Sequence, residues 1–454
     1  MLGETELKDL ADRALALSQA EQTEVVIFAP HSALTRFANS YIHQNVEQQD
    51  VDIRVRAVVG KKIGVASSND LSDEGLRSVV ERALALARHQ RDNPDFQSLP
   101  APKPVRQIDA FVERTAATGP EERAAVVGQV CDAATKAGLT AAGAFRTSQA
   151  EGAVANSLGV FAYHRDTMTD INTVVMGEQG SGHAERVSMD VADMDGAEVA
   201  KEAVDTALRN VNQIEVPPGE YDVVFKEYAF ADILDFFAYL SFGAQAYQEK
   251  RSFMAGRLGE RVMGEQISIW DDGLSPDTVP NPFDFEGVPK KRVTFIDQGV
   301  ARDVVWDSYT AGKDGADGPD GQSRKSTGHA LPAGSTFGPV PMNMFLGTGD
   351  ATLDDMVAST KRGVWVSRFW YTRTVHPLNV VVTGMTRDGT FLIEDGKITA
   401  PIKNLRFTQS YLEAMNQVEA IGKTATLHRA IAGGVSRAPA LKIAGWHFTG
   451  ASEY

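Results

Sequence analysis

Cysteine is nearly missing from this chain. Cys131 is the single cysteine among 454 residues. One cysteine excludes an intramolecular disulfide and suits a reducing compartment, so we expect a cytoplasmic protein. Cys131 lies in an apolar run with helical character, AAVVGQVCDAATKAG. We therefore interpret it as a small buried hydrophobe rather than as a catalytic thiol.

Long apolar runs and an excess of positive charge are also missing. No uncharged apolar run approaches the ~18–20 residues that span a bilayer, and the N-terminal run lacks the regions of a signal peptide. The chain has 60 acidic and 45 basic residues and a net charge of -15. Such a chain repels nucleic acid and anionic membranes, and we interpret the one short basic cluster, residues 290–292, as a solvated strand edge. We expect neither nucleic acid nor a membrane as a partner.

Local catalytic motifs are absent as well. The sequence has no G-x-S-x-G and no phosphate-binding P-loop motif, and no two of its nine histidines lie within one helical turn of each other. A zinc site built from residues that are distant in the sequence remains an alternative. Asp314, Asp317 and Asp320 recur among glycines, but they lack the oxygen spacing of a calcium loop. We interpret residues 311–332 as a solvated loop.

The first half of the chain alternates helix and strand signals. Ser72 is a predicted helix N-cap, Pro120 a predicted first helical residue, and Asn39 with Ser40 a predicted turn between strands. Gly180, Gly182 and His183 are assigned to a polar loop. The predicted helices cover 6–17, 70–87, 120–136 and 197–209. The predicted strands cover 24–28, 34–38, 42–48, 51–59, 63–67, 140–150, 151–160 and 159–175.

The segment VPPGEYDVVF marks a boundary, after which short strands bounded by Gly, Asp or Pro dominate. A helix at 353–359, with Thr352 as its N-cap, interrupts them. We predict an α+β fold: an N-terminal α/β domain at 1–214 and a β-rich, antiparallel, barrel-like C-terminal domain at 215–454.

Two segments of the second domain contain candidate site residues. The helix KEYAFADILDFFAYL is apolar over a broad face, and it places Asp235 and Tyr239 four residues apart on one side. A buried carboxylate needs a partner, so a structural hydrogen bond is favoured over acid–base catalysis. Ser326, Thr327 and His329 follow Arg324 in RKSTGHALP and are candidate substrate-binding residues. An ordinary turn is the alternative there.

The chain also resembles the TldD/PmbA family, once called modulators of DNA gyrase. RSFMAGRLGERV, GEQISIWDDG, RKSTGHALP and PMNMFLGTGDATLDDMVASTKRGVWV carry this resemblance, which covers nearly the whole chain. The family has two kinds of subunit. The TldD kind is a metallopeptidase with an HExxxH zinc helix and a C-terminal cysteine ligand, and the TldE (PmbA) kind lacks the zinc ligands and pairs with it. The resemblance implies proteolytic processing of unfolded peptides by a dimer.

The sequence departs from the TldD kind at the zinc ligands. Asp235 and Tyr239 lie near the ligand positions, and IAGWHFTGASEY has no cysteine. The resemblance therefore implies a TldE-like subunit with no cofactor of its own, with zinc only in a TldD-type partner. A TldD-type subunit or a second copy of the chain is the expected partner, and unfolded peptide the expected substrate. A peptide-binding scaffold protein and a stand-alone hydrolase with a non-standard site are the alternatives.

Overall fold

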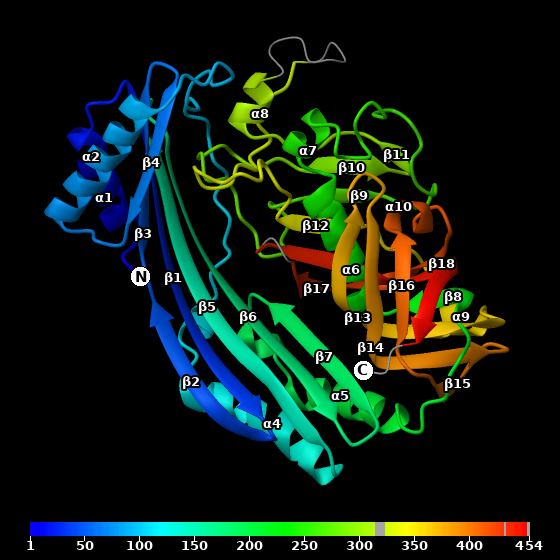
Figure 1. Ribbon diagram of the computed structural model, residues 1–454. Helices are drawn as coiled ribbons and strands as arrows, with labels where there is room; N and C mark the ends of the chain where they lie inside the picture. The colour runs from blue at the N-terminus through cyan, green and yellow to red at the C-terminus, as the bar shows by residue number, and fades with distance from the viewer. Residues whose placement is uncertain (314–322, 431–432, 452–454) are drawn as a thin grey trace.

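The computed structural model describes residues 1–313, 323–430 and 433–451, and these residues form an α+β fold. Two β-sheets, one in each half of the chain, organise it (Figure 1). The predicted loop aspartates Asp314, Asp317 and Asp320 lie outside the described residues. No helix of the described residues is both long and apolar enough to cross a membrane.

The first sheet is antiparallel throughout its seven described strands, and its order is β4-β3-β1-β5-β6-β7 with β2 paired to the far half of β1. All nine residues of β2 are exposed. The strands are β1 (Gln22–Ala38), β2 (Tyr41–Gln49), β3 (Asp52–Val59), β4 (Lys62–Ser68), β5 (Thr140–Asn156), β6 (Phe161–Met176) and β7 (Ser181–Ser188).

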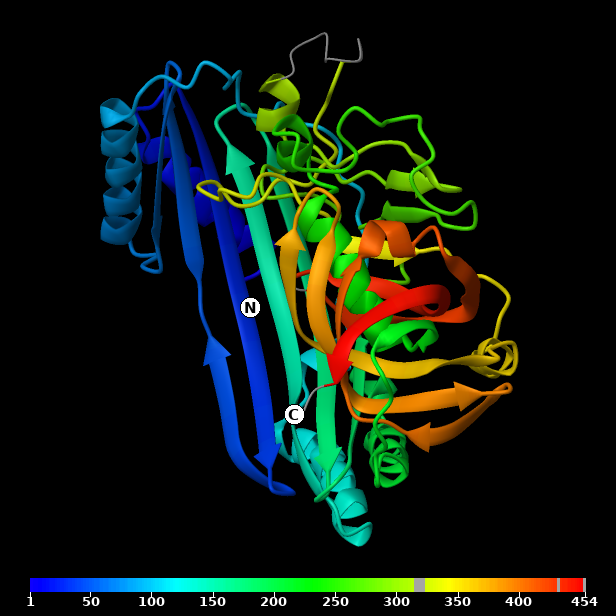
Figure 2. The same cartoon turned by 45° about the vertical axis from the view of Figure 1, so that its right-hand side comes forward.

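Side-chain alternation along β1 assigns the two faces of this sheet. Val25 and Ile27 point to one face and join the core under helices α1 and α2, while Val26 points to the other and packs with Phe283 of the second half. The sheet thus lies between helices and the C-terminal half of the chain (Figure 2). The helices of this half are α1 (Glu4–Leu17), α2 (Asp73–His89), α3 (Glu113–Ala116), α4 (Pro120–Lys136) and α5 (Gly196–Arg209), with a short 3-10 turn, η1 (Val191–Asp193).

The second sheet has eleven described strands in the order β11-β10-β9-β12-β18-β16-β14-β13-β8, with β15 on β14 and β17 on β18. Its strands are β8 (Gly219–Phe225), β9 (Ile269–Asp271), β10 (Val293–Asp297), β11 (Val300–Ala301), β12 (Asn343–Leu346), β13 (Arg362–His376), β14 (Val381–Glu394), β15 (Lys397–Pro401), β16 (Leu405–Ser410), β17 (Val418–Arg429) and β18 (Val435–Ala451). The helices are α6 (Glu227–Leu240), α7 (Ala244–Gln248), α8 (Ser308–Lys313), α9 (Leu353–Ala358) and α10 (Tyr411–Ala414).

The long strand β18 also pairs antiparallel with β8, so β8, β13, β14, β16 and β18 form a closed ring of strands. Helix α6 packs against β18 and β13 of this ring. Aromatic side chains fill the space between them: the Phe225 ring lies 4.8 Å from Trp446 and 5.2 Å from Phe369. This apolar cluster is the largest core of the molecule among the described residues.

Several local predictions are confirmed. Ser72 accepts a hydrogen bond from Gly75 N as the N-cap of α2, and Thr352 caps α9 in the same way. Pro120 begins α4. Asn39 and Ser40 adopt positive φ in the turn between β1 and β2. Each of these signals is a short-range one, in which the residues that define the structure are neighbours in the sequence.

Three predictions in the first half are wrong. The segments predicted as separate strands at 24–28 and 34–38 belong to one continuous strand, β1. The segments predicted as separate strands at 140–150 and 151–160 belong largely to one continuous strand, β5. Gly180, Gly182 and His183 were assigned to a loop, but Gly182 and His183 lie in β7. A Cβ on Gly182 would come within 2.1 Å of Ala203 O in α5. The glycine therefore permits close packing of a helix on a strand rather than a turn.

The basic cluster at 290–292 is not a solvated edge throughout. Lys290 is only 5% exposed. Burial lowers the pKa of its ammonium group, and the carboxylates of Asp271 and Asp284 act in the opposite direction. Lys290 is directed inward because these two carboxylates need a compensating charge in the interior.

A buried ion cluster joins the two halves, and we call it the Arg56 contact. Arg56 on β3 donates to Glu24 on β1 and, at 3.2 Å, to Glu286 of the second half. Ser308 donates to the other oxygen of Glu286 through its amide at 3.1 Å and its hydroxyl at 2.6 Å. Burial raises the pKa of Glu24 to about 7, and the negative charge of Glu286 raises it further. The positive charge of Arg56 opposes this rise. One guanidinium thus serves two buried carboxylates.

Candidate functional site

Helix α6 is the structural centre of the region where the sequence predicts a site. It begins after Lys226 and ends at Leu240, and most of its side chains are buried. Phe237 stacks on Phe242 at 6.0 Å between ring centroids, and Phe236 lies 5.9 Å from Tyr411. The apolar residues of the helix cover more than one face, which is why it is enclosed rather than laid on the surface.

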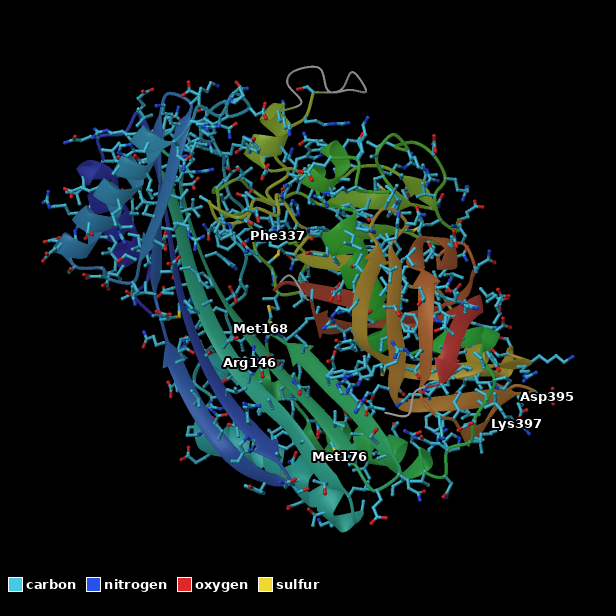
Figure 3. The ribbon with its side chains drawn as sticks, viewed as in Figure 1. Arg146, Met168, Met176, Phe337, Asp395 and Lys397 are labelled. Atoms are coloured by element: carbon cyan, nitrogen blue, oxygen red, sulfur yellow. The ribbon has the colours of Figure 1, made fainter. Side chains whose placement is uncertain are left out.

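The two predicted site residues of α6 lie in different surroundings. Asp235 is 6% exposed, whereas Tyr239, one turn further on, is 47% exposed. The Tyr239 ring lies 5.9 Å from the ring of Phe337, a surface residue labelled in Figure 3. A shared acid–base role requires both groups to reach the same substrate atoms. The structure places one in the interior and the other at the surface.

The residues of α6 do not fit a zinc ion. Zinc needs several imidazole, thiolate or carboxylate ligands that converge on one point. Position 235 offers one carboxylate, next to the ring of Phe236, and position 239 offers a phenol. Across the described parts of the chain, no three His, Cys, Asp or Glu side chains are grouped so that they could hold a metal.

Tyr228, on the first turn of α6, belongs to a polar cluster that the sequence did not reveal. Its hydroxyl lies 2.8 Å from Glu202 Oε1 on α5 and 3.0 Å from Arg186 Nη1 on β7. Arg186 also donates to Glu202 at 2.9 Å, and Lys226 donates to the same carboxylate. Burial raises the pKa of Tyr228 well above its ordinary value. We call this group the Tyr228 contact; these residues line a cleft of about 660 Å³ between the two halves.

A second ion pair lies beside this cleft. The Nδ1 atom of His428, on β17, is 2.6 Å from Glu185 Oε1 on β7. Burial alone would raise the pKa of Glu185, but the hydrogen bond and charge of His428 lower it to about 2. His183 packs edge-on against Tyr228 at 5.1 Å, and burial lowers its pKa to about 4. No sequence motif predicts this group, because its members come from β7, α6 and β17.

Asp232 is a further carboxylate of α6. It accepts hydrogen bonds from Thr372 Oγ1 at 2.8 Å and from Tyr411 OH at 3.3 Å. Burial raises its pKa to about 6, and the two hydrogen bonds oppose that rise. Asp232 therefore links α6 to β13 and α10.

The predicted substrate-binding residues Ser326, Thr327 and His329 are buried, with 8%, 7% and 2% of their surfaces exposed. His329 Nε2 lies 2.8 Å from Asp271 Oδ1, and its Nδ1 lies 3.0 Å from Thr327 Oγ1. Trp306 N donates to the Thr327 hydroxyl at 2.8 Å. These bonds fasten the segment to the core; a role in substrate binding stays a prediction.

The turn at these residues has little capacity for an anion. Thr327 N donates to Trp306 O at 2.9 Å, and Gly328 N donates to Ser326 Oγ at 3.2 Å. Gly328 has a φ of 80°, and a Cβ there would lie 2.5 Å from Pro289 O. The geometry is that of a tightly packed turn.

A larger groove lies at the C-terminal end of α6, with a volume of about 860 Å³. Ser252 Oγ, in its wall, donates to Ser241 O at the end of α6 over 2.7 Å. Phe253, also in its wall, packs against Phe237 of α6 at 5.9 Å. The wall of the groove therefore contacts the C-terminal part of α6 directly. Asp235 and Tyr239 are not among its lining residues.

Comparison with known proteins matches three family models along the chain. The PmbA/TldA metallopeptidase domain 1 matches residues 31–87, the central domain matches 112–211, and the C-terminal domain matches 218–450. Metalloprotease PmbA of Escherichia coli O157:H7 is 23% identical over 427 residues, 88% of each chain. The metalloprotease TldD homolog of Haemophilus influenzae is 27% identical over 233 residues, which are 50% of this chain and 46% of that relative. The chain spans about half the length of that relative.

Solved structures share the fold over the whole chain. TldE from Thermococcus kodakarensis has a TM-score of 0.88 at 19% identity and covers 98% of this chain and 100% of its own. A Thermotoga maritima protein described as a candidate modulator of a DNA gyrase has a TM-score of 0.86 at 18% identity, with 98% and 100% covered. With the C-terminal model alone matching half of the residues, the chain belongs to the PmbA/TldD metallopeptidase family.

Proposed function

We propose that this protein is a zinc-less subunit that pairs with a zinc-bearing family member in the proteolytic processing of peptides. The observation that carries the proposal is the composition of α6. This helix takes the place where the sequence resemblance puts the zinc ligands, yet its residues there are Asp235, which is buried, and Tyr239, which is at the surface. A catalytic zinc would need several converging ligands and an open position for water.

A stand-alone hydrolase has less support from the same geometry. Such an enzyme would need Asp235 to reach a substrate together with a second polar group. Asp235 is 6% exposed and lines neither the 860 Å³ groove nor the 660 Å³ cleft. Tyr239, four residues on, is at the surface beside Phe337.

The open edge of the first sheet supports association with a second family chain. Within the described residues β2 pairs with β1 alone, and every residue of β2 is exposed, including Tyr41, Ile42 and Val46. Such an edge is a ready template for another strand. Because family relatives share this fold, two chains related by a two-fold axis would present equivalent edges to each other.

The test combines metal analysis with a peptidase assay. We expect the purified chain to hold no zinc and to cleave no unfolded peptide alone. Mixing with a TldD-type chain should give chelator-sensitive cleavage above that of the TldD-type chain by itself. Val46→Lys, which places a charge on the open edge, should weaken the complex in size-exclusion chromatography. Chelator-sensitive cleavage by the pure chain would refute the proposal.

A further inference from the structure

Among the described residues, the charged side chains that line the 860 Å³ groove at the end of α6 are all cations. Three sections of chain form it: the α7 region, the end of α8 and the turn between β13 and β14. Its lining residues are Tyr247, Gln248, Lys250, Ser252, Phe253, Ala255, Gly256, Arg257, Lys313, Leu378 and Asn379. Three of them are cations, and no carboxylate lines the groove among the residues that the structure describes. The chain as a whole has 60 acidic and 45 basic residues, so this distribution runs against its composition.

Within the described parts of the chain, the carboxylates next to the groove are paired with cations. Arg257 Nε lies 3.3 Å from Glu260 Oε2, and both side chains are at least 40% exposed. Such a pair contributes little and yields readily to another anion. Glu249 is engaged by Arg251, whose Nε lies 2.7 Å from its Oε2, and the charge of Lys313 also acts on it. Lys250 and Lys313, both exposed, add two more ammonium groups to the lining.

Lys250 adopts a backbone conformation that is uncommon for residues other than glycine. Lys250 has a φ of 57°, in the left-handed region that glycine adopts at much lower cost. It directly follows the end of α7, where Lys250 N donates to Tyr247 O at 3.1 Å and Arg251 N to Ala246 O at 2.8 Å. A glycine at this position would adopt the same backbone conformation with less strain. Strain of this kind concentrates at functional positions.

The remaining lining supplies apolar contact. Leu378 is 40% exposed at the rim, and the Tyr247 ring lies edge-on to Trp306 at 6.0 Å. A groove that combines an apolar rim with three cations fits a chain carrying both carboxylates and apolar side chains. Nucleic acid fits it less well, since sites for a phosphate backbone use a longer track of cations and stacked aromatic rings.

We propose that this groove binds an acidic segment of an extended peptide, with Lys250, Arg257 and Lys313 contacting its carboxylates. The proposal rests on the peptide-handling role proposed above, and it specifies the class of peptide. Binding by this chain alone is sufficient to test it, without zinc or a partner subunit.

The experiment is fluorescence anisotropy of the full chain with a labelled, unstructured decapeptide that alternates Asp and Leu, compared with its Asn–Leu counterpart. We expect the acidic peptide to bind and its affinity to fall as salt rises. The double variant Lys250→Asn, Lys313→Gln should bind about tenfold more weakly, as the loss of two partly exposed charge contacts implies. Asparagine is chosen because it tolerates the left-handed backbone.

Two controls separate binding from folding. Lys250→Gly removes the ammonium group and relieves the left-handed backbone, so it should weaken binding while thermal stability holds or rises. Lys397→Asn changes an exposed lysine beside the turn between β14 and β15 (Figure 3) and should leave binding unchanged. Equal binding of both peptides, unchanged binding by the double variant, or tighter binding of an oligothymidylate in competition would each overturn the proposal.

The subunit role and the binding of acidic peptide in the groove can be refuted independently of each other. Acidic-peptide binding by a chain that never enhances cleavage by a TldD-type chain would refute the subunit role and support the groove. Enhanced cleavage together with equal binding of both decapeptides would refute the groove and support the subunit role.

Discussion

The Arg56 contact and the Tyr228 contact both join the first sheet to the second half of the chain, but their charges are balanced differently. In the Arg56 contact one guanidinium serves Glu24 and Glu286, both almost fully buried. In the Tyr228 contact two cations, Arg186 and Lys226, surround the single carboxylate of Glu202 beside an open cleft. An excess of buried negative charge favours proton uptake, whereas a surplus of cations keeps a carboxylate ionised.

This difference appears in the pKa values. Burial raises the pKa of Glu24 to about 7. Burial also acts to raise the pKa of Glu202, but Lys226 and Arg186 outweigh it and lower that pKa. The pKa of Glu185, which lies next to the Tyr228 contact, is lowered to about 2 by the hydrogen bond and charge of His428, against the effect of burial. The two connections between the halves should therefore respond to pH in opposite directions.

Removal of Arg56 is expected to have the largest effect. Arg56→Met leaves Glu24 and Glu286 buried without their cation, so the free energy of unfolding should fall by about 3–5 kcal/mol at pH 7. Urea denaturation measures it. Arg54→Met is the matched control on the same strand, because Arg54 has no buried carboxylate partner within the described residues: it pairs with a half-exposed Asp52 at 3.5 Å and donates to Ala333 O at 3.2 Å. That control should lose less than about 1 kcal/mol; equal losses would show that the buried pairing is not the cause.

Glu24 should make the protein less stable as pH rises toward neutrality. Its folded pKa of about 7 lies above the ordinary 4.5, so the folded state holds the extra proton between these values. Stability from this group is full below about pH 4.5 and is lost as pH rises through 7, by roughly 3 kcal/mol at most. Asp232, whose pKa is raised to about 6, contributes a decline of the same sign, so Glu24→Gln should make the decline in thermal unfolding from pH 4.5 to 8 shallower rather than abolish it. An identical slope in both proteins would contradict the assignment.

Glu185 should act on the acid side with a smaller effect. Its folded pKa of about 2 lies below the ordinary 4.5, so the stability it contributes is present above pH 4.5 and is lost as pH falls toward 2. Its side chain is 27% exposed, and solvent screening reduces the effect to roughly 2 kcal/mol. Glu185→Gln should flatten the acid limb of the stability profile and leave the limb attributed to Glu24 unchanged. Loss of both slopes in this variant would show that the two contacts are coupled.

Short-range signals in the sequence predicted many of the elements correctly. Ser72 and Thr352 are read as helix N-caps from their own chemistry and from the acidic residues that follow them. One prediction failed because a glycine is required by tertiary packing and not by a turn. Gly182 looks like part of a loop in the sequence, but it lies in β7 because α5 approaches that strand closely. The two segments 140–150 and 151–160 were both predicted as strands, but only the structure shows that they are one continuous strand, β5.

By itself, the sequence determined the fold class, the family and the departure from its zinc ligands, because these depend on which residue types occur and in what order. Only the tertiary structure decided that Asp235 is buried while Tyr239 is at the surface, since one turn of helix separates the core from solvent there. It also decided that Arg186, Glu202 and Tyr228 meet, and that Lys250 and Lys313 face one groove. These groups lie tens of residues apart in the chain, and nothing local in the sequence records which of them folding brings together.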